Sequence, residues 1–322
     1  MADLPQTPAH LSDVSTDDLL DQYGGEVESQ FAVASVMRQY VKIRPIKNTD
    51  TLVNNRVGRT QLQRLIPGVR PDAAPATQFG RVSLTVDTVV LARDNRSMLN
   101  DLQTHFDARM ELAQDHAKEL GKFFDQAFII QTIKGSGLAA PANLNGAIGA
   151  GQRKVLTAAG DETDPDKLYR GIADIIVQME EAEIPAHEML IFVRPTQYDV
   201  LLSNNKLISR DYSAMGGDFA KGVVQTIKDV RIEKSVRIPT APITNHYLSN
   251  TQNGMAYDVD SVEARAVAVV LHPRSLLAGE TIPLTSDIWF DRIEKQYFID
   301  SFLAFGVTPN RPDLCGALLK AA

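Results

Sequence analysis

The sequence predicts a mixed α+β fold, and three observations carry the prediction. Residues 104–134 repeat apolar side chains at spacings of three and four, which is the period of an amphipathic helix. Residues 81–87 alternate apolar and polar side chains, as a half-buried strand does. The runs 189–193 and 266–271 are continuously apolar, which is typical of strands buried on both faces. The chain therefore combines one long helix with strands of two kinds.

Composition narrows the classes of protein to which the chain can belong. Its 322 residues are 44% hydrophobic and 23% charged, which is ordinary for a globular protein. The formal net charge is −7, so the molecule as a whole does not attract phosphate, and general nucleic-acid binding is not expected. The single cysteine, Cys315, excludes an internal disulfide, fits a reducing cytoplasm and is expected to be a small buried hydrophobe. We see neither a secretory signal at the N-terminus nor a run of the ~20 apolar residues that span a bilayer.

The N-terminal segment is strongly acidic. Residues 1–37 contain no Lys or Arg, and helices are predicted from Ser15 and again over residues 26–39, with an interruption at Gly24-Gly25. This segment is either a frayed acidic arm or an arm that docks on a partner. Its acids are Asp3, Asp13, Asp17, Asp18, Asp21, Glu26 and Glu28.

Residues 51–93 predict a long two-stranded hairpin. Its first strand is placed at residues 56–66, its turn-rich tip at 67–75 and its second strand at 81–87. The first strand is polar, and an isolated hairpin is marginal in water. A neighbouring subunit is therefore the expected support for this hairpin.

The long helix and the segment after it offer no clear chemistry. Thr104 with Asp107 resembles a capping box, and Gly135 is expected to end the helix. His116 has no second metal ligand at helical spacing, so it is expected to be packed or solvent-facing. The Gly- and Ala-rich residues 135–151 lack a phosphate-binding pattern and are interpreted as a flexible connection.

From Asp164 onward the sequence predicts both helices and strands. Asp164-Pro165 predicts a capped helix start, and Pro185 is expected to end that helix. A short helix at 195–204 and strands at 230–236, 288–291, 297–306 and 314–319 follow.

No catalytic, cofactor or metal motif is present. The paired carboxylates Asp258/Asp260 and Asp164/Asp166 are interpreted as solvated loop residues, and neither His187 nor His272 has an obvious catalytic partner. We therefore expect no enzyme activity, no cofactor and no metal.

The order of these elements resembles the major capsid proteins of short-tailed, autographivirus-type bacteriophages, which have the Hong Kong 97-like fold. The resemblance covers essentially the whole chain, and its individual motifs are weak but collinear. One departure is Asp229, where a glycine is usual. The motifs are Gly24-Gly25-Glu26-Val27, Val57-Gly58-Arg59-Thr60, Ile66-Pro67-Gly68, Lys221-Gly222-Val223-Val224, Val230, Ile238-Pro239, Ala304-Phe305-Gly306, Arg311-Pro312 and Gly316-Ala317.

The resemblance implies a shell subunit that self-assembles into hexamers and pentamers around double-stranded phage DNA, without sequence-specific binding and without a membrane. A scaffolding protein, a portal at one vertex and a decoration protein are implied partners. The subunit is expected to assemble in the host cytoplasm and to reside in the virion. The implied divisions are an N-terminal arm (1–50), an extended loop (51–93), a peripheral domain (94–160) with its spine helix (104–134), an axial domain (161–280) and return strands (281–322).

Two other interpretations remain open, an encapsulin-type nanocompartment shell and a cytoplasmic α/β enzyme. For a capsid, we hypothesise that the acidic arm of one subunit meets the basic extended loop of its neighbour. An ordinary solvated face is the alternative. The candidate contact residues are Asp17, Asp18, Asp21, Glu26 and Glu28 on the arm and Arg56, Arg59, Arg64, Arg70 and Arg81 on the loop.

The extended loop also predicts how the shell is held together. Some relatives cross-link their subunits through a lysine in this loop, whereas residues 52–90 contain no lysine. Intact shells should therefore dissolve to single chains on a denaturing gel. A ladder of covalent multimers would contradict this.

Overall fold

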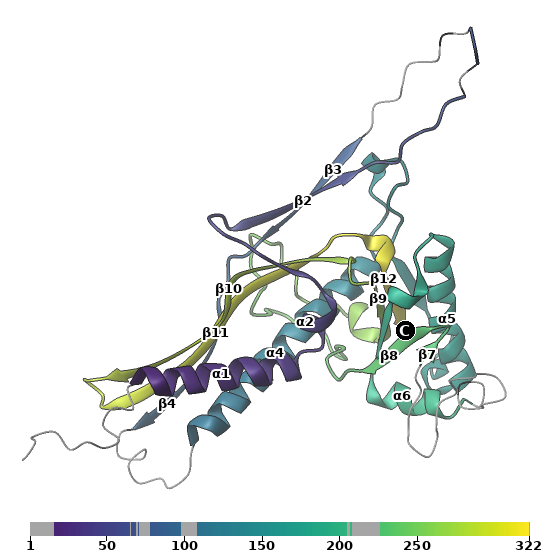
Figure 1. The fold of residues 1–322 in the computed structure, drawn as a ribbon. Coiled ribbons are helices and arrows are strands. Elements are labelled where there is room, and N and C mark those ends of the chain that lie inside the picture. The colour runs from purple at the N-terminus through teal and green to yellow at the C-terminus, as the bar shows by residue number, and fades with distance from the viewer. Residues whose placement is uncertain are drawn as a thin grey trace, which may run out of the picture.

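The computed structural model describes residues 16–64, 66–68, 70, 78–97, 108–204, 207 and 226–321. Two sheets lie on either side of a long helix, and a narrow hairpin projects from the body (Figure 1). None of the helices described is both long and apolar enough to cross a bilayer. Short 3-10 turns lie at η1 (Ala142–Leu144), η2 (Asp161–Thr163), η3 (Ala186–Glu188), η4 (Glu263–Arg265) and η5 (Pro312–Leu314).

The acidic arm forms helix α1 (Thr16–Ala34) and a single turn, α2 (Met37–Tyr40). The predicted interruption at Gly24-Gly25 is wrong, because α1 continues through both glycines. Helical glycine costs about 1 kcal/mol relative to alanine. Burial of Tyr23, Val27 and Phe31 against the body offsets that cost. The predicted helix over residues 26–39 is also interrupted, since α1 ends at Ala34.

Helix α4 (Ala108–Ser136) is the long helix that the periodicity predicts. Its buried residues repeat at the predicted positions, among them Ala113, Ala117 and Leu120. The predicted capping box at Thr104 lies outside the described residues. At the other end, Arg153 Nη2 donates to the carbonyl of Ile133 at 2.8 Å and satisfies part of the last turn.

A six-stranded sheet has the order β5-β12-β9-β6-β8-β7. The predicted strands at 189–193 and 266–271 are confirmed as neighbours inside it, and all their residues are buried. Alternate residues of β6 face two cores: Phe192 faces the core around α4, and Ile191 faces the core under α5. The elements are β5 (Gln152–Val155), α5 (Pro165–Glu181), β6 (Leu190–Val193), α6 (Pro195–Leu202), β7 (Thr226–Ile227), β8 (Val230–Lys234), β9 (Ala266–Leu271) and β12 (Cys315–Leu319).

A four-stranded sheet, in the order β1-β10-β11-β4, covers the other side of α4. Its centre is the antiparallel pair β10 (Leu276–Asp291) and β11 (Gln296–Pro309). Strand β1 (Ile43–Pro45) runs parallel to β10 at one edge, and β4 (Val90–Ser97) pairs with β11 at the other. The long pair extends beyond the core toward one end of the molecule (Figure 1).

The projecting hairpin consists of β2 (Thr51–Val57) and β3 (Phe79–Thr85). The two strands pair from Thr51–Thr85 to Val57–Phe79. The predicted first strand, 56–66, is therefore wrong in position, because pairing is confined to the root of the hairpin. Residues 59–64 beyond it form no strand.

The Gly- and Ala-rich segment 135–151 is packed at its two ends and buried at Leu144 and Ile148, whereas residues 137–140 are exposed. Gly135 lies against Cys315, whose thiol is fully buried, as expected, with its pKa raised to about 12 by that burial. Gly151 lies against the backbone of Gly135 and Ser136. A side chain at either glycine would collide with these neighbours.

The turn between β7 and β8 explains the departure at Asp229. Lys228 and Asp229 both have positive φ, at 47° and 66°. Glycine adopts this conformation without a steric penalty, whereas aspartate is among the few other residues that tolerate it. The turn therefore keeps its hairpin geometry with aspartate in place of the usual glycine.

Gly151→Ala should lower the free energy of unfolding by about 1–3 kcal/mol, because the new methyl group would overlap backbone atoms that cannot rotate away. The control is Gly25→Ala in α1, where no atom lies within 4 Å of the new methyl group. That change should raise stability by about 0.5–1 kcal/mol. Urea unfolding of the unassembled protein measures both, and equal effects would contradict the packing described.

Candidate subunit-contact surfaces

A buried carboxylate fixes the arm to the spine helix. Asp125 on α4 accepts hydrogen bonds from Ser35 Oγ at 2.7 Å and from the backbone N–H groups of Val36 and Met37 at 3.0 and 3.1 Å. These donors belong to the break between α1 and α2. Burial raises the pKa of Asp125, and the three hydrogen bonds act in the opposite direction. The break in the arm is thus anchored at one point of α4.

A second polar cluster joins the arm to the four-stranded sheet. The Tyr23 hydroxyl lies 2.8 Å from His116 Nδ1 and 3.0 Å from Ser301 Oγ, and burial raises the pKa of Tyr23 to about 12. His116 Nε2 lies 2.9 Å from Asp94 Oδ2 on β4. His116 is therefore a packed residue, as the sequence predicts, and it connects α1, α4, β4 and β11.

The root of the hairpin rests on its own subunit. Asn54 Nδ2 donates to Asn310 Oδ1 at 2.8 Å, and the half-buried Arg56 donates from Nη2 to the carbonyl of Pro309 at 3.4 Å. Leu84 packs against Gly306 of β11. The expectation that the hairpin as a whole needs a neighbour is corrected for this part. Arg56, a predicted contact residue, is held here within its own chain.

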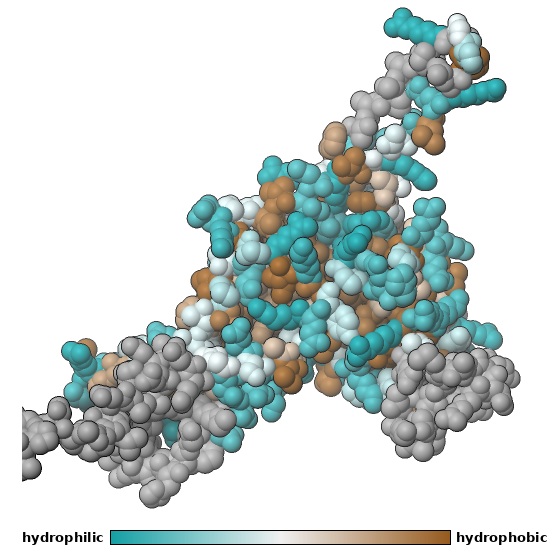
Figure 2. Space-filling model, viewed as in Figure 1, coloured by the Kyte–Doolittle hydropathy of each residue, from teal (hydrophilic) through white to brown (hydrophobic). Residues whose placement is uncertain are grey.

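Beyond the paired strands the hairpin rests on the body through Leu144, whose carbonyl accepts from the Arg59 N–H at 3.2 Å. Apolar side chains at the outer end of the strand pair and beyond it are open to solvent: Phe79 is 67% exposed, Val57 57% and Leu62 96%. Figure 2 shows the hairpin as a thin projection with both hydrophobic and hydrophilic side chains. All four of the other predicted contact residues on the hairpin are exposed: Arg59, Arg64 and Arg70 beyond β2, and Arg81 on β3.

The predicted acidic contact residues lie on α1. Glu28 is exposed, and Glu26 accepts a hydrogen bond from Gln30 at 3.0 Å. The side chains of Asp17, Asp18 and Asp21 lie outside the described part of the structure. Neither Glu26 nor Glu28 pairs with a hairpin arginine of the same chain in the described residues, so any such pair would join two subunits.

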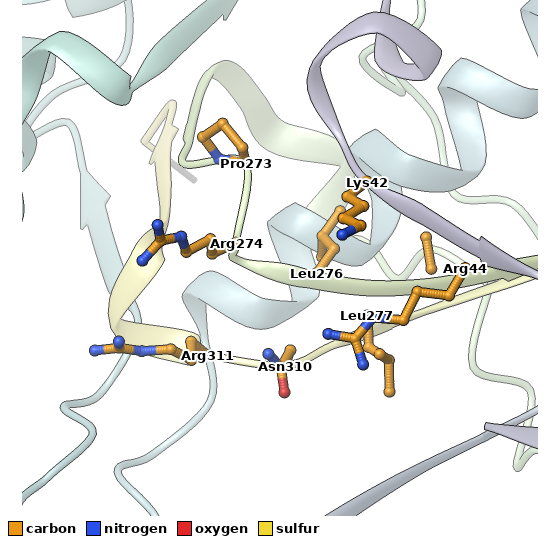
Figure 3. A pocket seen from close by; sticks show the side chains of 9 residues that line it. Lys42, Arg44, Pro273, Arg274, Leu276, Leu277, Asn310 and Arg311 are labelled. Carbon is orange, nitrogen blue, oxygen red and sulfur yellow. The ribbon is translucent and has the colours of Figure 1, made fainter. Parts of the chain in front are cut away.

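Sequence reasoning missed a basic cavity of about 280 Å³ between β1 and the start of β10 (Figure 3). Its cations come from three distant segments, so no local pattern in the sequence could have indicated it. They are Lys42, Arg44, Arg274 and Arg311.

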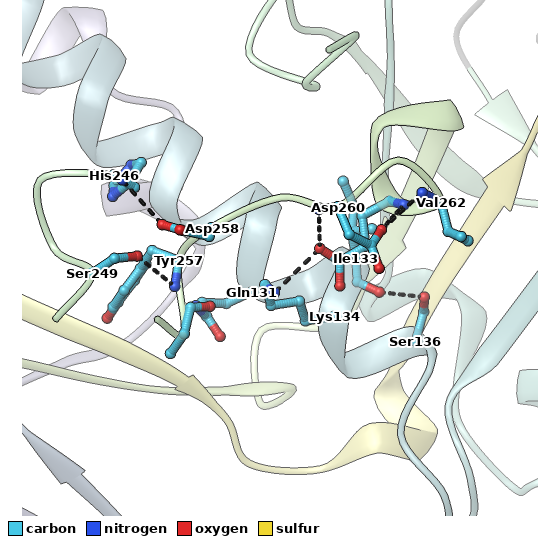
Figure 4. A network of polar contacts seen from close by, with 12 residues as sticks. Gln131, Ile133, Lys134, Ser136, His246, Ser249, Tyr257, Asp258, Asp260 and Val262 are labelled. Atoms are coloured by element: carbon cyan, nitrogen blue, oxygen red, sulfur yellow. Dashed lines mark hydrogen bonds and ion pairs between the residues drawn. The ribbon is translucent and has the colours of Figure 1, made fainter. Parts of the chain in front are cut away.

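A network of loop hydrogen bonds fixes residues 243–265 to α4 (Figure 4). Gln131 Nε2 donates to the carbonyl of Ala256 at 2.9 Å, and Lys134 pairs with Glu263 at 3.2 Å. Asp260 is exposed and Asp258 half-buried, in agreement with the expected loop carboxylates. Each also accepts two backbone N–H groups, from residues 245–246 for Asp258 and 262–263 for Asp260. These carboxylates hold the loops in place.

Residues 85–276 match the family described as Gp10A-like, major capsid protein. The chain belongs to this family. No curated protein matches it at a significant level.

Solved capsids show the same fold for this capsid protein. The bacteriophage PhiM1 mature capsid subunit is 26% identical, with a TM-score of 0.78 over 89% of this chain and 87% of that one. The cyanophage P-SCSP1u capsid subunit is 18% identical, also with a TM-score of 0.78, over 89% and 88%. A virus-like particle from Pyrococcus furiosus is 9% identical, with a TM-score of 0.56 over 94% and 99%, and shares the fold alone.

The chain is therefore a shell-forming phage capsid protein with a Hong Kong 97-like α+β fold. Of the three interpretations left open by the sequence, family membership supports the phage capsid. The homo-oligomeric shell follows from that membership.

Asp125→Ala should lower the free energy of unfolding by about 2–4 kcal/mol, because it leaves Ser35 Oγ and two backbone N–H groups buried without an acceptor. The matched control is Asp115→Ala on the exposed face of α4, expected to change stability by less than about 0.5 kcal/mol. Urea titration of both variants measures the difference. If the two variants unfold with similar urea midpoints and slopes, Asp125 does not anchor the arm.

Proposed function

We propose that this capsid protein forms the hexamers and pentamers of an icosahedral shell around double-stranded phage DNA, with no enzymatic step of its own. The observation that carries the proposal is the projecting hairpin, whose distal apolar side chains have no partner in the described chain. Apolar side chains exposed on a projection are typical of interaction surfaces. A neighbouring subunit would cover them.

The anchored root makes this contact stronger. Because Asn54 and Arg56 hold the base of the hairpin, its direction is set before assembly. A contact surface that is already oriented loses less conformational entropy on binding than a free loop does. Each contact is small, and repetition over many copies makes weak contacts sufficient.

We infer that charge sets the register of this contact. The exposed hairpin arginines, Arg59, Arg64, Arg70 and Arg81, would face the acidic α1 of a neighbour. Exposed ion pairs contribute only about 0–1 kcal/mol each, so they act on specificity and rate of assembly more than on affinity. Arg56 would act at the root, inside its own subunit.

The remaining parts of the proposal follow from the family. We propose the division into arm, extended loop, peripheral domain, axial domain and return strands at the boundaries given above. We also propose a scaffolding protein, a portal and a decoration protein as partners, assembly in the host cytoplasm and residence in the virion. The net charge of −7 favours such a container, because a basic wall would hold the genome and hinder its movement.

Purified native protein should form closed particles by electron microscopy, and Arg59→Glu with Arg64→Glu should reduce their yield while the unassembled chain stays folded by circular dichroism. The control is Lys118→Glu with Arg170→Glu, which makes the same charge change on exposed faces of α4 and α5. Small oligomers in place of particles for the native chain would refute the proposed function. Normal particles from the hairpin variant would refute the charge register alone.

A further inference from the structure

The basic cavity lies where three segments meet (Figure 3). Lys42 and Arg44 come from the chain around β1, Arg274 precedes β10, and Arg311 follows β11. Leu276, Leu277 and Ala278 supply an apolar lining. Asn310 also lines the cavity, and since its Oδ1 accepts the bond from Asn54, its Nδ2 is left as a donor.

The cavity has an excess of positive charge. No acidic residue lines it, and Lys42, Arg44 and Arg274 form no ion pair with the described residues. Only Arg311 is neutralised, by Asp313 at 2.5 Å. An adjacent cavity shares Lys42 but contains Glu280, which pairs with Arg38 at 3.3 Å. Like charges gathered without a counter-charge repel one another, so this arrangement favours a bound anion.

The N-terminal segment has the complementary chemistry. Residues 1–37 have no basic side chain, and most of their acids fall within residues 13–28. The cavity also adjoins the root of the hairpin, because its Asn310 holds Asn54 of β2. An arm that follows a neighbour's hairpin toward the body therefore reaches this cavity.

The acidic segment of the same chain does not reach it. Gly24 of α1 lies against Ser286, ten positions along β10 from Leu276 at the cavity. At ~3.4 Å per residue that separation is about 30 Å. The segment that occupies the cavity must therefore come from another copy.

We propose that the cavity formed by Lys42, Arg44, Arg274 and Arg311 binds carboxylates of residues 13–28 from a second copy of this chain. The inference rests on the proposed function and adds to it a defined acceptor for the arm. The hairpin arginines guide the arm, and the cavity receives it.

A fluorescent peptide of residues 13–28 tests this by anisotropy with the unassembled full-length chain. Its affinity should fall about tenfold or more for Arg44→Glu with Arg274→Glu, and stay unchanged for Lys118→Glu with Arg170→Glu, which has the same net charge. A peptide with lysines at its six acidic positions should bind the cavity variant better than the native chain. If the variant with Arg44→Glu and Arg274→Glu does not fold, the neutral variant with Arg44→Gln and Arg274→Gln takes its place, with the same expected loss of peptide affinity.

Equal affinity for the cavity and control variants, or for an uncharged Asn/Gln peptide, would overturn the inference. So would a DNA oligonucleotide that binds in a cavity-dependent way while the peptide does not, since the partner would then be nucleic acid. If the native chain forms particles but does not bind the peptide, this inference is rejected and the proposed function stands. A native chain that forms no particles rejects the proposed function whatever the peptide does.

Discussion

The packing of aromatic side chains on α4 is the interaction on which the rest of the structure depends. The ring centroid of Phe124 lies 5.6 Å from that of Phe31 on the arm and 4.7 Å from that of Phe305 on β11. Phe128 lies beside Phe124 at 4.6 Å. The same helix packs on β9 and β12 of the other sheet. One helix therefore joins the arm and both sheets into one body.

Because the core is centred on α4, the arm, the hairpin and the basic cavity all lie at the surface of the subunit. The arm covers α4 with one face, and Glu28 and Val33 remain exposed on another. The hairpin is anchored only at its root, and the cavity opens beside that root. A subunit built in this way carries projections and receiving surfaces on a rigid centre. That is the physical requirement for a shell made of many copies, in which each contact is weak.

Much of this architecture could be predicted from the sequence, because local periodicity reports burial. Helix α4, β6 and β9 follow directly from their apolar patterns. The Asp164 cap of α5 is confirmed too, since its carboxylate accepts from the N–H groups of Asp166 and Lys167. The patterns failed where tertiary packing decides. Burial of Val27 carries α1 through two glycines, and beyond Val57 the N–H of Arg59 bonds to Leu144 of the body instead of continuing the strand pair.

The candidate contact surface was less predictable. Charge alone indicated the arm and the hairpin arginines, but it could not show that Arg56 bonds within its own subunit. Asp125 and Ser35 are ninety positions apart, so nothing local marks their hydrogen bond. The cavity is a product of topology, since the parallel pairing of β1 with β10 brings Arg44 beside the segment that contains Arg274.

The central claim is that neighbouring subunits cover the distal hairpin in the shell. Amide hydrogen exchange at residues 60–64, compared between the unassembled chain and assembled particles, tests it most directly. These residues lie beyond the last backbone hydrogen bonds of the hairpin, from Gly58 to Gln78 and from Arg59 to Leu144, and should exchange at least about tenfold more slowly in particles. Equal exchange in both states would show that the hairpin stays in solvent and would contradict the account.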